Sequence, residues 1–126
     1  IKGFESVTME CVVAAVKLGI DARVLPSVAQ ALFRHPDFDS LANHVSERVT
    51  VHGKRRAAEM REVAATLEHL GLPAFMAQAT ASHQQWVTDL GVRNAFPGEV
   101  PKDALRIARA LLERLELEEQ QMRDRC

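Results

Sequence analysis

The stretch that decides the fold is residues 52–73, HGKRRAAEMREVAATLEHLGLP. Its apolar residues recur at intervals of three and four, which predicts an amphipathic helix over about residues 54–70. Gly71 ends that helix, and Pro73 is well placed as the first residue of the next one, because proline is favoured at that position. The apolar stripe of the predicted helix consists of Met60, Val63, Ala64, Leu67 and Leu70.

Three shorter helical patterns precede this stretch. The first ends at Gly19, where a left-handed C-cap is expected. Asp21 is expected to cap a second helix that continues to about residue 33, with Pro26 tolerable only near its first turn. A third helix is predicted to begin at residue 39 or 40 and to end or kink near residues 50–53, which include Gly53.

Two further helices are predicted after the opening stretch. One runs from Pro73 to near Gly91, residues 92–101 form a loop, and the last covers about residues 102–123. Strand signals are nearly absent. The sequence therefore predicts an all-α fold, one domain over residues 1–126 with five to seven helices. In the last helix, the residues expected to face inward are Leu105, Ala108, Leu111, Leu112 and Leu115.

Composition limits the class of protein. The 126 residues carry a formal net charge of −1, whereas a duplex-binding domain usually has a basic excess. Cys11 and Cys126 make no disulfide framework, and no secretory signal or membrane-spanning run is evident. We therefore expect a cytoplasmic protein that does not contact membranes. Because the helical pattern begins at Ile1 without a Met or a cap, we also expect a piece of a longer protein.

The usual sequence signals of a complete catalytic centre are missing. No glycine-rich loop follows a strand, and no Cys/His pair has zinc-ligand spacing, so no metal site is predicted. Ser82 and His83 lack an obvious third partner for a nucleophilic triad. His35, His44 and His52 can meet only through tertiary folding, and solvated or capping roles are favoured for them. We therefore do not expect the chain alone to be an active enzyme.

Two segments nevertheless resemble a known family. IKGFESVTMECVVAAVKLGID (residues 1–21) and HGKRRAAEMREVAATLEHLGLPAFMAQATASHQQWV (residues 52–87) resemble the C-terminal domain of NAD(P)-dependent oxidoreductases like 6-phosphogluconate dehydrogenase. Glu10 with the Gly-Ile-Asp at 19–21 matches the end of that superfamily's long helix. Glu-Met-Arg at 59–61 and Gly-Leu-Pro at 71–73 match its Lys-Asp-Leu helix and the following Gly-x-Pro. The more specific likeness, in the RRAAEM run, is to the uncharacterised C-terminal domain of a bacterial branch of the superfamily, which includes the β-hydroxyacid dehydrogenases.

The resemblance implies that the protein has two domains with different roles. In that superfamily an N-terminal Rossmann domain binds NAD or NADP, and the helical domain completes the substrate cleft and forms a homodimer. The catalytic lysine lies on the long helix, at a position upstream of Ile1, so no catalytic residue is assigned here. Ala58 stands where the family has the lysine of Lys-Asp-Leu, and Arg55 or Arg56 is the nearby replacement.

Four residues are therefore candidates for binding an anionic hydroxy-acid substrate: Lys2, His52, Arg55 and Arg56. A guanidinium holds a carboxylate or a phosphate with two parallel hydrogen bonds. Cations at a predicted helix start also oppose the helix dipole, and such a violation often marks a functional site. A solvated face remains an alternative, because Arg55 and Glu59 are four residues apart and can form an ion pair on one helix face.

Other prominent residues are predicted to have structural roles. Glu10 is expected to face a neighbouring helix or subunit, and Phe75 and Trp86 are expected in the core or in dimer contacts. Gly3 and Gly53 either permit a close helix approach or weaken their helices.

Two other functions remain open at this stage. The apolar stripes are compatible with a free-standing helical module that binds a partner protein. The Lys-Arg-Arg run at 54–56 is compatible with a helical nucleic-acid binder, although the balanced charge makes that reading weaker.

Overall fold

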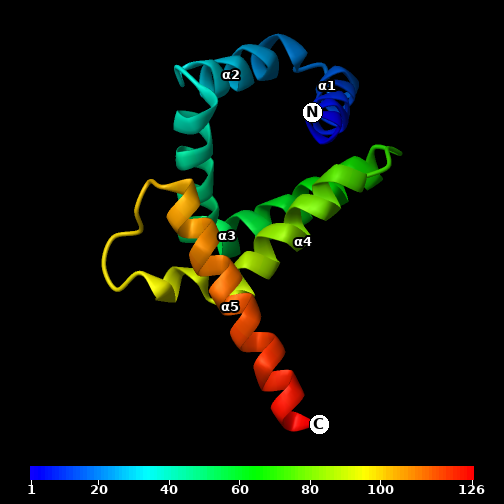
Figure 1. Cartoon of the computed structure of the whole chain (residues 1–126). Helices are drawn as coiled ribbons and strands as arrows, with labels where there is room; N and C mark the ends of the chain where they lie inside the picture. Colours follow the sequence, from blue (N-terminus) through cyan, green and yellow to red (C-terminus); the bar gives the residue numbers. More distant parts are fainter.

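A computed structural model describes all 126 residues as helices joined by short connections, without any strand. Five α-helices and one 3₁₀ helix are present, which confirms the all-α prediction (Figure 1). In chain order they are α1 (Lys2–Lys17), α2 (Asp21–Phe33), α3 (Phe38–His69), α4 (Phe75–Leu90), η1 (Val92–Ala95) and α5 (Ala104–Arg125). No helix is both long enough and apolar enough to cross a membrane.

Helices α1 and α2 form a unit that we call the arm. The arm contacts the rest of the chain where α1 packs against α4. Gly19 adopts a left-handed conformation at φ 69°, so the predicted end of the first helix is confirmed. Two of the predictions about α2 are wrong. Ile20, not Asp21, is its N-cap residue, and no side chain caps this end. Pro26 lies well inside the helix, where its ring nitrogen has no hydrogen to donate to the preceding turn. No residue of α2 is fully buried.

Helix α3 joins the two helices that were predicted over residues 39–53 and 54–70. It is one continuous helix that begins after Asp37, whose carboxylate accepts a hydrogen bond of 2.8 Å from the amide of Ser40. The predicted break is therefore wrong, but the predicted kink is visible as a change of direction along α3 (Figure 1). Thr50 donates its hydroxyl hydrogen to the carbonyl of Ser46, a contact that often bends helices.

Helices α3 and α4 form an antiparallel hairpin with small residues at its centre. Gly53 lies where the two helices meet: a Cβ atom there would come within 2.7 Å of Thr88 Oγ1 and 3.1 Å of the Gln84 carbonyl oxygen. The close-approach interpretation of Gly53 is therefore confirmed, whereas Gly3 has open space around it. Helix α4 begins at Phe75, two residues after the predicted Pro73. Alanines dominate the buried contacts of this hairpin: Ala57, Ala64, Ala74, Ala77 and Ala81.

The loop and α5 close the other end of the hairpin. Val92 of η1 and Val100 of the loop that follows it pack with Ile107 and Ala110 of α5 and with the end of α4. Asp103 caps α5 by accepting from the amide of Arg106. The predicted inward face of α5 is partly wrong. Leu111 and Leu115 touch this core, but three other predicted residues are exposed: Leu105, Ala108 and Leu112.

The core is small for the length of the chain. Only 15 of 126 residues are buried, and Val92 is the largest fully buried side chain. Phe75 is 72% exposed and Trp86 is 40% exposed, so neither is a core residue, and the alternative that they form dimer contacts stays a prediction. Because the helices meet through alanines, the large apolar side chains stay on the outside. This leaves much apolar surface uncovered within the chain.

Candidate functional site

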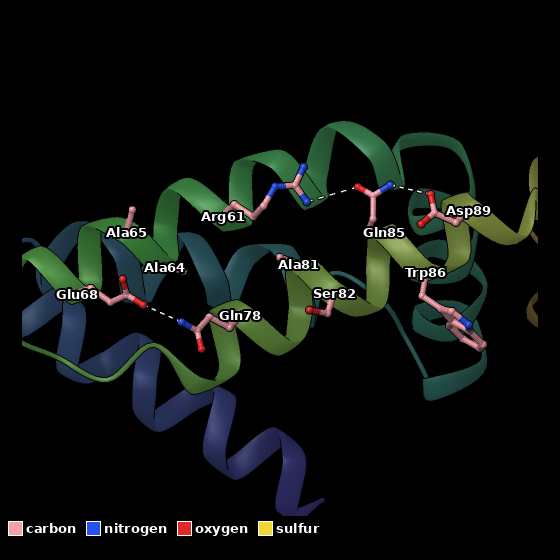
Figure 2. Close-up of a pocket in the computed structure, with 10 residues that line it drawn as sticks. All are labelled: Arg61, Ala64, Ala65, Glu68, Gln78, Ala81, Ser82, Gln85, Trp86 and Asp89. Atoms are coloured by element: carbon pink, nitrogen blue, oxygen red, sulfur yellow. Dashed lines mark hydrogen bonds between the residues drawn. The ribbon is translucent and has the colours of Figure 1, made fainter.

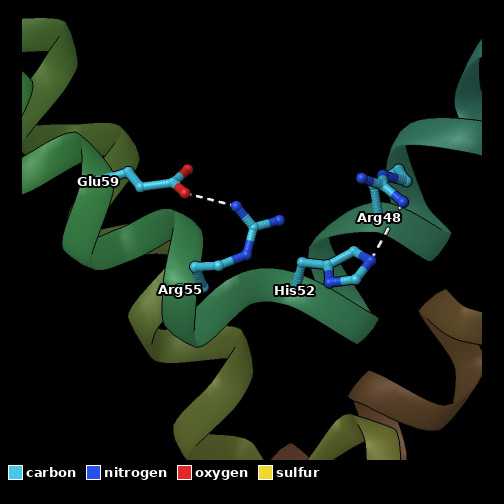
Figure 3. Close-up of polar contacts among 4 residues, drawn as sticks. All are labelled: Arg48, His52, Arg55 and Glu59. Carbon is cyan, nitrogen blue, oxygen red and sulfur yellow. Dashed lines mark hydrogen bonds and ion pairs between the residues drawn. The ribbon is translucent and has the colours of Figure 1, made fainter.

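A stripe of charged side chains runs along α3 where the helix changes direction. Arg48, His52, Arg55 and Glu59 are spaced by four, three and four residues, which places them on one side of the helix. We call these four residues the basic stripe; Figure 3 shows them with their contacts. Three of the four are basic, and His52 and Arg55 were both predicted from the sequence.

Within the basic stripe, Arg55 is already paired. Its Nη1 donates to Glu59 Oε1 across one helical turn, and this is the only ion pair in the chain. The predicted Arg55–Glu59 interaction is therefore confirmed. Both side chains are more than half exposed, so the pair contributes little to stability. Part of the positive charge of the stripe is neutralised locally, as the solvated-face interpretation predicts.

The imidazole of His52 is a hydrogen-bond acceptor in this arrangement. Arg48 Nη1 lies 3.1 Å from His52 Nε2, and since a guanidinium only donates, Nε2 has to be unprotonated. Partial burial, and then the positive charges of Arg48, Arg55 and Arg56, lower the pKa of His52 below 6.5. His52 is therefore neutral at pH 7, and lowering the pH adds a further positive charge to the stripe.

The pH dependence of His52 can be measured directly. We expect its NMR titration midpoint to lie below 6.5 and to rise in the Arg48→Ala variant, because a neighbouring positive charge is removed. Since the folded chain binds this proton less readily than the unfolded chain, stability should decrease as the pH falls below about 6.5. Arg125→Ala, at the far end of α5, is the control. An equal shift of the His52 midpoint in both variants would contradict the local cause.

The remaining candidate residues occupy different environments. Arg56 follows Arg55 and is half-buried, with its Nε atom buried and without a hydrogen-bond partner. Lys2 lies at the first turn of α1, exposed and without a hydrogen bond or ion pair. Helix α1 packs against α2 and α4. The structure thus gathers three of the four predicted residues at the bend of α3 and leaves Lys2 on the arm.

His35 and His44 meet at the junction of α2 and α3. Their ring centroids are 5.0 Å apart, and His44 Nε2 accepts from Arg34 at 3.0 Å. Partial burial, followed by the charge of Arg34, lowers the pKa of His44. Nowhere do three His, Cys, Asp or Glu side chains gather closely enough to hold a metal ion. The contact between these two histidines is a packing feature of the α2–α3 corner.

A polar groove that was not predicted from the sequence lies between α3 and α4. It has a volume of about 610 Å³. Along its rim Gln85 accepts from Arg61 at 3.4 Å and donates to Asp89 at 2.9 Å (Figure 2). At its other end Gln78 donates to Glu68 at 2.7 Å. A spacing of seven residues between Arg61 and Glu68, and again between Gln78 and Gln85, was the available signal.

Glu10 connects the arm to the hairpin. Its two carboxylate oxygens accept from the amides of Met76 and Ala77, each at 2.9 Å. These are unpaired amides of the first turn of α4, which has no capping side chain of its own. The prediction that Glu10 faces a neighbouring helix is confirmed. An apolar groove of about 410 Å³ surrounds this contact between α1 and the start of α4.

The fold thus defines an all-helical domain with a small core, uncovered apolar surface and a basic stripe at a helix bend. The sequence profile called Domain of unknown function (DUF1932) matches residues 15–87, and the chain belongs to this family. The family is known as the C-terminal helical domain of proteins like 6-phosphogluconate dehydrogenase. The resemblance to this family that was inferred from the sequence is therefore confirmed. No curated protein and no solved structure matches the chain.

Proposed function

We propose that this chain is the substrate-cleft and dimerisation domain of an NAD(P)-dependent oxidoreductase of the β-hydroxyacid dehydrogenase type. The substrate is a small hydroxy acid. Its hydroxyl-bearing carbon loses a hydride to NAD or NADP, and its hydroxyl proton goes to a base, so that a carbonyl forms. The cofactor is bound mainly by an N-terminal Rossmann domain. The helical domain contributes groups that hold the substrate anion and surfaces that hold the second subunit.

The observation that carries the proposal is the imbalance between the small core and the apolar surface outside it. A chain of this length ordinarily buries a larger share of its side chains. Here only 15 of 126 residues are buried. Such apolar surface is typical of a domain that packs against other parts of a protein. The exposed apolar residues of α1 and α2 are Phe4, Val7, Met9, Val13, Val16, Leu25, Val28 and Phe33.

The basic stripe and the adjacent Arg56 support an anionic substrate. His52 is held by Arg48, Arg55 by Glu59, and the guanidinium of Arg56 retains an unpaired buried nitrogen. The terminal NH₂ groups of Arg56 are not buried and make no hydrogen bond within the chain, so they are free to bind an incoming carboxylate through charge-assisted hydrogen bonds. Arg56 is therefore the first of the candidates to test, and Arg55 is the second.

Replacing both arginines tests the proposed role. In the full-length protein, Arg55→Ala combined with Arg56→Ala should raise KM for a hydroxy acid by roughly tenfold to hundredfold. This corresponds to about 2 kcal/mol of charged hydrogen bonding. The value of kcat should change little, since this binding is shared by the ground state and the transition state. Steady-state kinetics with NAD and with NADP provides the measurement.

Glu59→Gln is the matched control for this test. It removes the ion pair with Arg55 but keeps both arginines, so KM should stay the same or fall. If the double arginine variant lowers only the thermal stability and leaves KM unchanged, the basic stripe and Arg56 form a solvated face. A full-length protein that oxidises no hydroxy acid with either cofactor would contradict the proposed function itself.

The uncovered apolar surface equally favours a helical module that binds a partner protein without catalysis. The two functions differ in what accompanies the domain. A strand followed by Gly-x-Gly-x-x-Gly, encoded upstream in the same reading frame, favours the oxidoreductase. Its absence from that reading frame favours the interaction module.

A further inference from the structure

Helix α5 carries two apolar faces, and the chain covers only one of them. Ile107 and Ala110 pack into the core. On the neighbouring side of the helix, Leu105 is 65% exposed, Leu112 is 57% exposed and Met122 is 62% exposed. The side predicted to face inward is largely the side that remains outside. Leucines on a helix surface at such spacing are typical of an interface.

The second half of α5 projects away from the rest of the chain. Every residue from 116 to 126 is exposed, and the red end of the helix extends beyond the other helices in Figure 1. A helical segment of this length is marginal in water without packing contacts. None of its charged side chains forms an ion pair within the chain. The segment therefore lacks the contacts that normally stabilise a helix.

One stripe of α5 has the spacing of a coiled coil. Its members alternate at intervals of three and four residues: Leu105, Ala108, Leu112, Leu115, Glu119 and Met122. All of them are exposed except Leu115, which is half-buried at the edge of the core. We propose that this stripe pairs with the same stripe of a second copy, in antiparallel orientation. The inference rests on the dimerising role within the proposed function, and it assigns that role to α5.

Charge determines the orientation of the pair. In a parallel pair Glu119 would face the same glutamate of the second copy inside the seam, where two carboxylates repel each other. In the antiparallel register that places Leu112 against the partner's Leu115, Glu119 faces an alanine of the stripe. The same register brings Arg109 beside the partner's Glu116, and symmetry forms this opposite-charge pair twice.

The antiparallel register also accounts for the projecting half of α5. The centre of the stripe, between Leu112 and Leu115, lies close to the middle of the helix. Residues 116–126 of one copy then lie along the first half of the partner's α5, which is seated on the partner's core. Each projecting segment is thereby covered by the copy to which it does not belong.

Reversing charges across the seam tests this arrangement. Arg109→Glu alone and Glu116→Arg alone should each raise the dimer dissociation constant of the full-length protein, by roughly tenfold. The combined variant should restore it, because the opposite charges again face each other across the two copies. Within one helix the two residues are two turns apart, so restoration reports the contact between copies. Sedimentation velocity over a concentration series measures the constant.

Two leucines provide the apolar test and its control. Leu112→Ser, inside the stripe, should abolish the dimer, whereas Leu117→Ser, 52% exposed on a different side of α5, should leave it intact. Circular dichroism establishes that both variants remain helical. A monomeric parent protein, a dimer unaffected by Leu112→Ser, or a combined charge reversal that fails to restore association would overturn the proposal.

These outcomes separate the inference from the proposed function. If the protein oxidises a hydroxy acid but its dimer does not depend on α5, only the α5 pairing is contradicted. A dimer that depends on α5 in a protein without any oxidoreductase activity overturns only the proposed reaction.

Discussion

Gly53→Val is expected to destabilise the chain by about 3 kcal/mol, the largest effect of any single substitution we consider. For a domain of this size, a loss of that magnitude lowers Tm on the order of 10 °C. The cause is steric. A Cβ atom at Gly53 would lie 2.7 Å from Thr88 Oγ1 and 3.1 Å from the Gln84 carbonyl oxygen. The threonine side chain can rotate away, but the carbonyl belongs to the backbone of α4, so the two helices must separate.

Thermal unfolding followed by circular dichroism measures this effect. Gly3→Ala is the matched control, since an added Cβ at Gly3 meets no atom within 4 Å and alanine favours the helix. Gly53→Ala should fall between the two, because its better helix propensity, about 1 kcal/mol, offsets part of the clash. Adding Thr88→Ala to Gly53→Ala should recover some stability. A Gly53→Val variant as stable as the parent would show that the hairpin is not closely packed there.

The glycine at 53 also explains where sequence reasoning about α3 failed. From the local sequence alone, a glycine after Thr50 and before a run of cations indicates the junction of two helices. The close contact that makes glycine necessary comes from Thr88 and Gln84, which lie more than thirty positions away. Local pattern predicted the helical state on both sides and the change of direction. It contained no information about α4, against which Gly53 packs.

Helix α5 shows a second kind of limit. Its sequence contains one apolar face with Ile107 and Ala110 and another with Leu105 and Leu112, and both have helical spacing. Hydrophobic periodicity identifies the faces but not which of them the core will cover. The larger leucines led to the wrong choice. The smaller face is buried because Val92 of η1 and Val100 of the following loop pack there.

The candidate site was predictable to the extent that it is local. The Arg55–Glu59 pair follows from a spacing of four on one helix, and the structure contains it. The Arg48–His52 contact has the same spacing and was overlooked. The groove lined by residues of α3 and α4 could not be predicted from the sequence, because its position depends on how the two helices of the hairpin pack. The exact partners of Glu10 were hidden for the same reason.

Glu10→Ala is expected to destabilise the chain by about 2 kcal/mol, through the loss of two charge-assisted hydrogen bonds at the start of α4. The carboxylate also interacts favourably with the positive end of the α4 dipole. No side chain within α4 replaces it as a cap. Because Glu10 belongs to α1, the loss should be concentrated where the arm meets the hairpin. Amide hydrogen exchange should accelerate in α1 and in the first turn of α4, and remain unchanged in η1 and the first half of α5.

Glu5→Ala is the control, since Glu5 is exposed on the same helix and makes no hydrogen bond through its side chain. Glu10→Gln separates charge from geometry: its single amide oxygen can accept from one of the two α4 amides, and its NH₂ group is a donor with nothing to accept it there. Its stability should therefore lie much closer to that of Glu10→Ala than to the parent. Equal exchange rates in the Glu10 and Glu5 variants would mean that the arm is held by its apolar contacts with α4 alone. The uncovered arm would then need the rest of the protein, rather than this carboxylate, to fix its position beside the hairpin.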